Sequence, residues 1–225
     1  MPPAALNTLY QQTTERTLAL WRDAPGCGEV MQSDYYDKSA FAPVAGIQPA
    51  LSPALRELLL AVNKLAEGDP LADAMPLSGL HFTFLAIALP RYPPQARPSA
   101  LASLLNLWQP YRSAPLTITD LRLVALPGQL LLAGIADDQS QADRGALAQQ
   151  LLASDWRNEI QARYGNTPLP PPFWHSTLLR YQAQRLPEAW RAFFLSRQRL
   201  RYGAVSAPRQ LVMANYNWTQ VEPLA

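Results

Sequence analysis

The chain has 225 residues, 48% of them hydrophobic, and a formal net charge of +2 at pH 7. These values suit one large domain with a packed core, and so small a charge surplus gives no strong field for nucleic acid. A lone cysteine, Cys27, excludes an intramolecular disulfide and a cysteine-based zinc site. The sequence has neither a secretory signal nor an apolar run that could span a bilayer, so we expect a cytoplasmic protein without membrane contact.

Hydrophobic periodicity and breaker residues divide the chain into helices and strands. The best-marked helix has Ser52 as its N-cap, Pro53 in its first turn and Gly68 at its end. In chain order we predict a helix over about 8–22, a strand over 46–51, that helix, a strand over 79–89, a helix over 98–109, strands over 116–126 and 129–136, a broken helix over 141–164, a strand over 173–181, a helix from Pro187 and a strand over 209–218.

This order contains two comparable halves, each with one histidine-bearing strand near a helix and a further strand. We therefore predict an α+β fold that is bilobal and pseudo-symmetric, with two antiparallel-rich sheets flanked by helices. The active-site cleft is expected between the two sheets.

The two histidines of the chain occupy the same four-residue frame, His81-Phe-Thr83-Phe and His175-Ser-Thr177-Leu. Both frames lie in apolar runs that favour strands, where residues i and i+2 point to one face. Each frame therefore presents an imidazole beside a hydroxyl. Histidine suits proton transfer near neutral pH, and threonine offers a neutral hydrogen-bond donor. Two such frames facing one another would form an acid/base site for an anion.

Other readings of single residues remain open. A strand histidine is often a core residue, and two histidines could bind zinc only with added carboxylates, for which no motif is present. The tyrosines of the loop at Tyr35 and Tyr36 could stack on bases or simply be exposed. The basic run at 197–201 could contact an RNA backbone or stabilise a helix C-terminus.

The paired frames, 94 residues apart, resemble the two-histidine phosphoesterase superfamily. It includes bacterial RNA 2',3'-cyclic phosphodiesterases, also called 2'-5' RNA ligases, and phosphodiesterases of cyclic nucleotides and ADP-ribose cyclic phosphate. The run from His175 to Arg180 is similar to the His-x-Thr-Leu-x-Arg form of the RNA-directed members. By this resemblance, residues 46–225 form the phosphoesterase-like domain and residues 1–45 an N-terminal extension or lid. The Arg-x-Phe strand of the ligase-like branch has no clear counterpart here.

The resemblance implies that His81 and His175 are the catalytic acid and base, and that Thr83 and Thr177 bind phosphate oxygens. It implies no metal and no cofactor. Because the family more often yields a 2'-phosphate, His81 would protonate the leaving oxygen and His175 would activate water. Arg180 and Tyr181 are further candidates for substrate binding. On a regular strand Arg180 would face away from His175, where a salt bridge is as plausible as phosphate contact. Tyr181 would share the face of His175 and could line the mouth of the cleft, although packing in the core is the more common place for such a residue.

The sequence thus predicts a metal-independent cyclic phosphodiesterase that acts, as a monomer, on an RNA terminus or a cyclic nucleotide. Which of RNA, mononucleotide or ADP-ribose cyclic phosphate is the substrate stays open. One rival is a non-catalytic protein that binds RNA ends or nucleotides and retains the frames. Another is a structural domain in which the histidines are merely buried.

Overall fold

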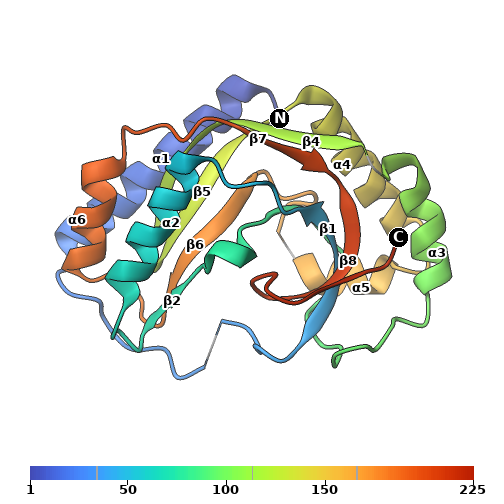
Figure 1. Ribbon diagram of the computed structural model, residues 1–225, viewed down its shortest axis with the longest axis horizontal. Coiled ribbons are helices and arrows are strands. Elements are labelled where there is room, and N and C mark those ends of the chain that lie inside the picture. The colour runs from blue at the N-terminus through green and yellow to red at the C-terminus, as the bar shows by residue number, and fades with distance from the viewer. Residues whose placement is uncertain (34, 113, 166) are drawn as a thin grey trace.

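The computed structural model describes residues 1–33, 35–112, 114–165 and 167–225. Its strands form two antiparallel sheets flanked by helices, which confirms the predicted α+β class and its two-sheet arrangement. Figure 1 shows the two sheets near the middle of the molecule, with α1, α2 and α6 on one side and α3, α4 and α5 on the other.

The two histidine segments belong to different sheets. Within the described ranges, the smaller sheet has the order β3-β1-β8-β9 and the larger has the order β2-β6-β5-β4-β7, with every pairing antiparallel. The strand bounds are Phe41–Ile47 (β1), Ala72–Ala74 (β2), Phe82–Ala86 (β3), Pro115–Leu126 (β4), Gln129–Ala136 (β5), His175–Tyr181 (β6), Val205–Pro208 (β7), Gln210–Asn215 (β8) and Val221–Pro223 (β9).

The helices cover the outer faces of the sheets. Their bounds are Pro3–Asp23 (α1), Pro53–Ala66 (α2), Leu101–Trp108 (α3), Asp138–Leu152 (α4), Arg157–Tyr164 (α5) and Glu188–Arg197 (α6), with short 3-10 turns at Leu77–Gly79 and Gln109–Tyr111. The predicted cap of α2 is confirmed, because the Ser52 side chain accepts a hydrogen bond from the Leu55 amide. None of the helices in the described ranges is both long and apolar enough to cross a lipid bilayer.

Helix α1 packs against β4 and β5 and belongs to the main core. Its Leu6, Tyr10 and Trp21 are buried in the same apolar cluster as both histidine strands. The Tyr10 hydroxyl donates to the Gly134 carbonyl at 2.8 Å. The Thr17 hydroxyl donates to the Ala125 carbonyl at 3.0 Å. The segment expected as an extension or lid therefore supplies part of the interior.

The first strand lies earlier in the chain than predicted, at Phe41–Ile47 instead of 46–51. The sequence did not predict a strand at Pro43, because proline is rare inside sheets. Here the Pro43 carbonyl accepts a hydrogen bond from the Ile87 amide. The Pro43 nitrogen therefore points to the same side, toward the end of β3, and the pairing of β1 with β8 is not interrupted. The predicted strand over 209–218 is also too long, because β8 ends at Asn215 and a tight turn with Trp218 at φ 55° leads into β9.

Candidate active site

Both histidine frames line a single cleft of about 450 Å³. His81 immediately precedes β3, at the edge of the smaller sheet, and His175 begins β6, an inner strand of the larger sheet. Thr83 and Thr177 line the same cleft. The remaining lining comes from aromatic, cationic and small side chains, chiefly Tyr36, Val44, Arg144, Arg163, Tyr164, Thr167, Phe173, Arg180, Asn215, Tyr216 and Trp218.

Each frame contains a β-bulge at its fourth residue. On β6 the pairing with β5 passes from Thr177 to Leu179, so Leu178 has no partner of its own. On β3 the pairing with β1 passes from Thr83 to Leu85 and skips Phe84 in the same way. A bulge adds one residue to a strand and reverses the alternation of side chains beyond it. The fourth residue of both frames thus has the same structural role.

The bulge in β6 decides which of two predicted residues reaches the cleft. Beyond it, Arg180 shares the cleft with His175, whereas a regular strand would have turned it away. Tyr181, predicted on the face of His175, does not line the cleft and is buried in the core with 5% exposure. Its phenol lies near Asp69, and burial raises the pKa of Tyr181 to about 12. Of the two readings of Tyr181, the structure thus supports the core position, and Tyr181 lies outside the cleft.

The His81 ring is fixed on two sides. Its Nδ1 lies 2.7 Å from the Gly79 carbonyl, so Nδ1 carries the hydrogen and Nε2 is left for proton transfer. The indole of Trp218 stacks on the imidazole, with centroids 4.9 Å apart and planes 7° from parallel. Gly46 makes room for this indole, because a Cβ there would lie 2.9 Å from the Trp218 ring.

His175 is held differently. Its Nδ1 is buried and has no hydrogen-bond partner among the described residues. The ring meets Phe173 edge to face, with centroids 6.2 Å apart. Two cations lie near it, since Arg180 and Arg144 both lower the pKa of His175.

Both imidazoles are neutral at pH 7 in the free protein. Burial lowers the pKa of His81 to about 3, although the hydrogen bond to Gly79 opposes this, and the charges of Arg180 and His175 lower it further. Burial also lowers the pKa of His175 to about 4. His175 is among the groups that lower the pKa of His81, as expected for two rings that line one cleft.

The Arg180 guanidinium lies between aromatic rings and a carboxylate. Its Cζ is 5.2 Å from the Tyr36 ring centroid and 5.5 Å from that of Tyr216. Its Nη1 is 3.8 Å from the Asp73 carboxylate, a separation that leaves the ion pair weak. Tyr36 and Tyr216 are stacked with centroids 6.3 Å apart, so a predicted loop tyrosine reaches the cleft.

Sequence reasoning missed several lining residues. Arg144, Arg163 and Trp218 come from segments without a motif, and only the folded chain brings them to the frames. Of the other candidates, Tyr35 and the arginines at 197, 199 and 201 do not line the cleft.

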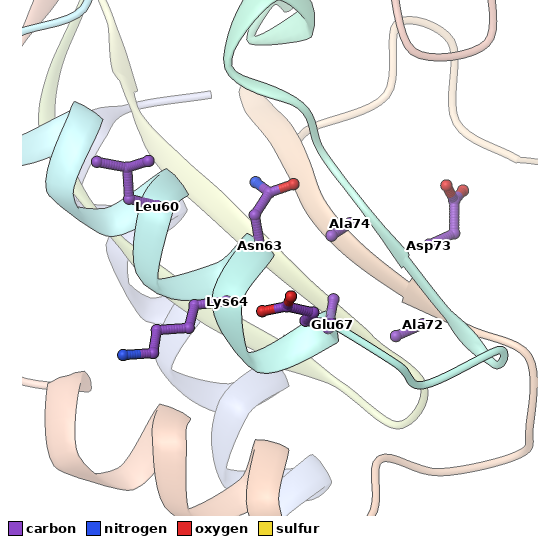
Figure 2. A pocket seen from close by; sticks show the side chains of 8 residues that line it. Leu60, Asn63, Lys64, Glu67, Ala72, Asp73 and Ala74 are labelled. Atoms are coloured by element: carbon purple, nitrogen blue, oxygen red, sulfur yellow. The ribbon is translucent and has the colours of Figure 1, made fainter.

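A second hollow lies between α2 and β2 and has a volume of about 580 Å³ (Figure 2). Figure 2 shows Lys64 and Asp73 pointing away from one another instead of converging on a common point. The Asn63 amide is already bonded to the carbonyls of Leu59 and Met75. Neither histidine lines this hollow, and its polar groups do not form a reactive set. In the part of the chain that the structure describes, no three His, Cys, Asp or Glu side chains are grouped to hold a metal ion.

No protein-family model matches the chain, and no curated protein matches it. Among solved structures the chain is similar to TT0787 of Thermus thermophilus, with 17% identity, 81% of this chain and 97% of that one covered, and a TM-score of 0.48. It is also similar to ATU0111, a conserved protein of unknown function from Agrobacterium tumefaciens. That match has 11% identity, 85% and 89% coverage, and a TM-score of 0.46. What the cleft can do follows from the side chains that line it.

Proposed function

We propose that the protein is a metal-independent phosphoesterase that opens 2',3'-cyclic phosphates of RNA ends or small nucleotides. The observation that carries this proposal is the single cleft lined by both His-x-Thr frames together with Arg180. Two imidazoles, two hydroxyls and a guanidinium suit a reaction in which an anion gains charge while protons move on both sides of it. The two-sheet fold is compatible with a two-histidine phosphoesterase.

The reaction needs one base and one acid. His175 Nε2 takes a proton from water, whose oxygen forms a bond to phosphorus. The bond from phosphorus to the ribose 3' oxygen breaks, and His81 Nε2 gives its proton to that oxygen. The product is a 2'-phosphate with a free 3' hydroxyl, and the pair returns to its starting state by exchanging one proton with solvent.

The surroundings of the two rings support this assignment. A charged His81 keeps its donation to the Gly79 carbonyl, and the face of Trp218 favours a cation. His175 has no acceptor at Nδ1 among the described residues, and two arginines near it favour its neutral form. We therefore assign His81 as the acid and His175 as the base in the complex with a bound phosphate, although in the free protein desolvation dominates and puts the pKa of His81, about 3, below that of His175, about 4.

Arg180 and the two threonines stabilise the negative charge of the transition state. Arg180 lies near both imidazoles, since it lowers the pKa of each. A guanidinium in this position can bind two phosphate oxygens at once. The hydroxyls of Thr83 and Thr177 are neutral donors for the remaining oxygens.

The proposal is tested by turnover of adenosine 2',3'-cyclic phosphate, followed by chromatography of the 2'- and 3'-phosphate products. We expect a 2'-phosphate, formed at the same rate with and without EDTA. His81→Ala and His175→Ala should each lower kcat by about 10²- to 10⁴-fold, and the double variant should fall little further because the two rings act in one transition state. Added imidazole should restore part of the rate in each single variant.

Two results would contradict the proposal. One is loss of activity on chelation with recovery on adding Mn²⁺ or Zn²⁺. The other is tight binding of the cyclic nucleotide or its product without turnover, which would identify the non-catalytic binding protein instead.

A further inference from the structure

Arg144, on α4, is a buried cation in the cleft wall without a counter-ion. Arg144 is 4% exposed, and its Cζ lies 3.5 Å from the Trp174 ring centroid. Nη1 donates to the Phe173 carbonyl at 3.2 Å, while Nε is buried without a partner in the described part of the chain. Within the same ranges no acidic side chain forms an ion pair with it. Burial lowers the pKa of Arg144 to about 10, so it remains charged at neutral pH.

Two buried arginines outside the cleft have more acceptors than Arg144. Arg191 donates to four backbone carbonyls, those of Leu186, Trp21, Ala24 and Gly26. Arg209 binds the Asp143 carboxylate at 2.6 Å and the Ser140 hydroxyl at 2.8 Å, so its charge is paired even though its Nε, like that of Arg144, has no partner among the described residues. A buried charge without such partners is costly and calls for an explanation. An anionic ligand that enters the cleft would supply the missing acceptor.

Arg144 lies to one side of the histidine pair. It bonds the carbonyl of Phe173 and covers the ring of Trp174, the two residues that directly precede His175, so it lies on the His175 side of the pair. Arg163 and Thr167 line the cleft together with Arg144. No described lining residue is Asp or Glu, so the cleft has three arginines and no carboxylate. This is more positive charge than a single bound phosphodiester requires.

We propose that the part of the cleft formed by Arg144, Arg163 and Thr167 binds a second phosphate of the substrate, on the His175 side of the phosphate that is opened. This rests on the proposed function. The substrate class is then a nucleoside 2',3'-cyclic phosphate that also carries a 5' phosphate, either terminal or internucleotide. The planar guanidinium matches phosphate oxygens in pairs, and a cleft of about 450 Å³ lies in the range of sites that hold a whole nucleotide.

The kinetic test compares three substrates: adenosine 2',3'-cyclic phosphate, its 5'-phosphorylated form, and a dinucleotide with a free 5' hydroxyl that ends in a 2',3'-cyclic phosphate. We expect the second phosphate to raise kcat/KM by about 10- to 100-fold, mainly through KM, because it is remote from the bond that breaks. A gain confined to the 5'-phosphorylated mononucleotide identifies a site for a terminal phosphate. A gain with the dinucleotide identifies a site for an internucleotide phosphate. Equal kcat/KM for all three would overturn the inference.

Variants assign the effect to Arg144. Arg144→Met should reduce the preference to about twofold, whereas Arg199→Met, which removes the same charge from an exposed position, should leave the preference as in the wild type. Arg144→Lys keeps the charge without the paired donors and should retain part of the preference, so it serves if the Met variant fails to fold. An unchanged preference in folded Arg144→Met would assign the arginine a structural role.

A binding measurement separates this inference from the proposed function. Adenosine 2',5'-bisphosphate should bind more tightly than adenosine 2'-phosphate by calorimetry, and Arg144→Met should abolish the difference. If no cyclic phosphate is turned over but the bisphosphate still shows this Arg144-dependent gain, the phosphoesterase proposal fails and the second phosphate site stands. If turnover occurs and the two ligands bind equally, the second phosphate site fails alone.

Discussion

The two imidazoles differ in what surrounds them, although their sequence frames match. His81 donates to a carbonyl and stacks on an indole, while His175 faces an aromatic edge and two arginines. Desolvation lowers the pKa of both rings, so neither is an imidazolium in the free protein at pH 7. A bound phosphate reverses part of this effect, because an anion favours the imidazolium.

We therefore predict different pH profiles for kcat/KM and kcat. The pKa values of the free pair, about 3 and about 4, lie below the ordinary 6.5, so kcat/KM should fall as pH rises above about 4. The pair in the complex has higher pKa values, so the bell for kcat should lie at higher pH. Steady-state rates between pH 4 and 9 measure both profiles. The limbs belong to the coupled pair.

Single variants provide the control. Removing His81 should abolish the limb that requires a protonated group, and removing His175 the limb that requires a neutral one. Rates independent of pH from 5 to 9, with chemistry shown to limit turnover, would exclude proton transfer by these rings.

At the residue level the sequence predicted the frames but not their surroundings. His81, Thr83, His175 and Thr177 could be found because two identical spacings reinforce each other. Arg144 could not, since a helical arginine without a motif is usually exposed, and its burial depends on Trp174 lying beneath it.

At the level of the strands, the two bulges determine which side chains share the cleft with the histidines. A regular β6 would present Tyr181 and hide Arg180, whereas the bulge at Leu178 reverses them. Sequence alternation predicted the regular case, because a bulge depends on the register with a partner strand and leaves no mark in a single strand.

This reversal predicts opposite results for neighbouring variants. Arg180→Met should lower kcat/KM for a 2',3'-cyclic nucleotide by about 10²- to 10³-fold, because a donor to the developing charge is lost. Tyr181→Phe, which removes only a hydroxyl outside the cleft, should change kcat/KM less than threefold. Steady-state kinetics with circular dichroism as the folding control measure both. The reverse pattern would mean that β6 is regular.

For the whole molecule, the sequence predicted two sheets and their class but not the place of the N-terminal helix. Its contacts join residues more than a hundred positions apart, as between Thr17 and Ala125. Helix α1 has a polar sequence with few apolar positions, so its periodicity does not reveal that Tyr10 bonds the backbone at Gly134 and Trp174.

We predict that removing residues 1–24 prevents folding, because the buried surface of β4 and β5 and several backbone groups would lose their partners. Tyr10→Phe is the milder variant and should lower the free energy of unfolding by about 1–3 kcal/mol, since two buried groups lose a hydrogen bond. Urea unfolding measures the change, with exposed Gln12→Ala as the control. A truncated chain that keeps its fold and activity would show that the segment is a removable lid.

The stacking of Trp218 on His81 allows the site to be followed by tryptophan fluorescence. A protonated imidazole accepts an electron from an excited indole, so the emission of Trp218 depends on the protonation state of the ring beneath it. Ligands that raise the pKa of His81 should lower the fluorescence of Trp218 at constant pH. Trp218→Phe should remove that response while the other tryptophans still emit. The protein thus contains its own optical probe, which follows the proposed acid during binding without any added label.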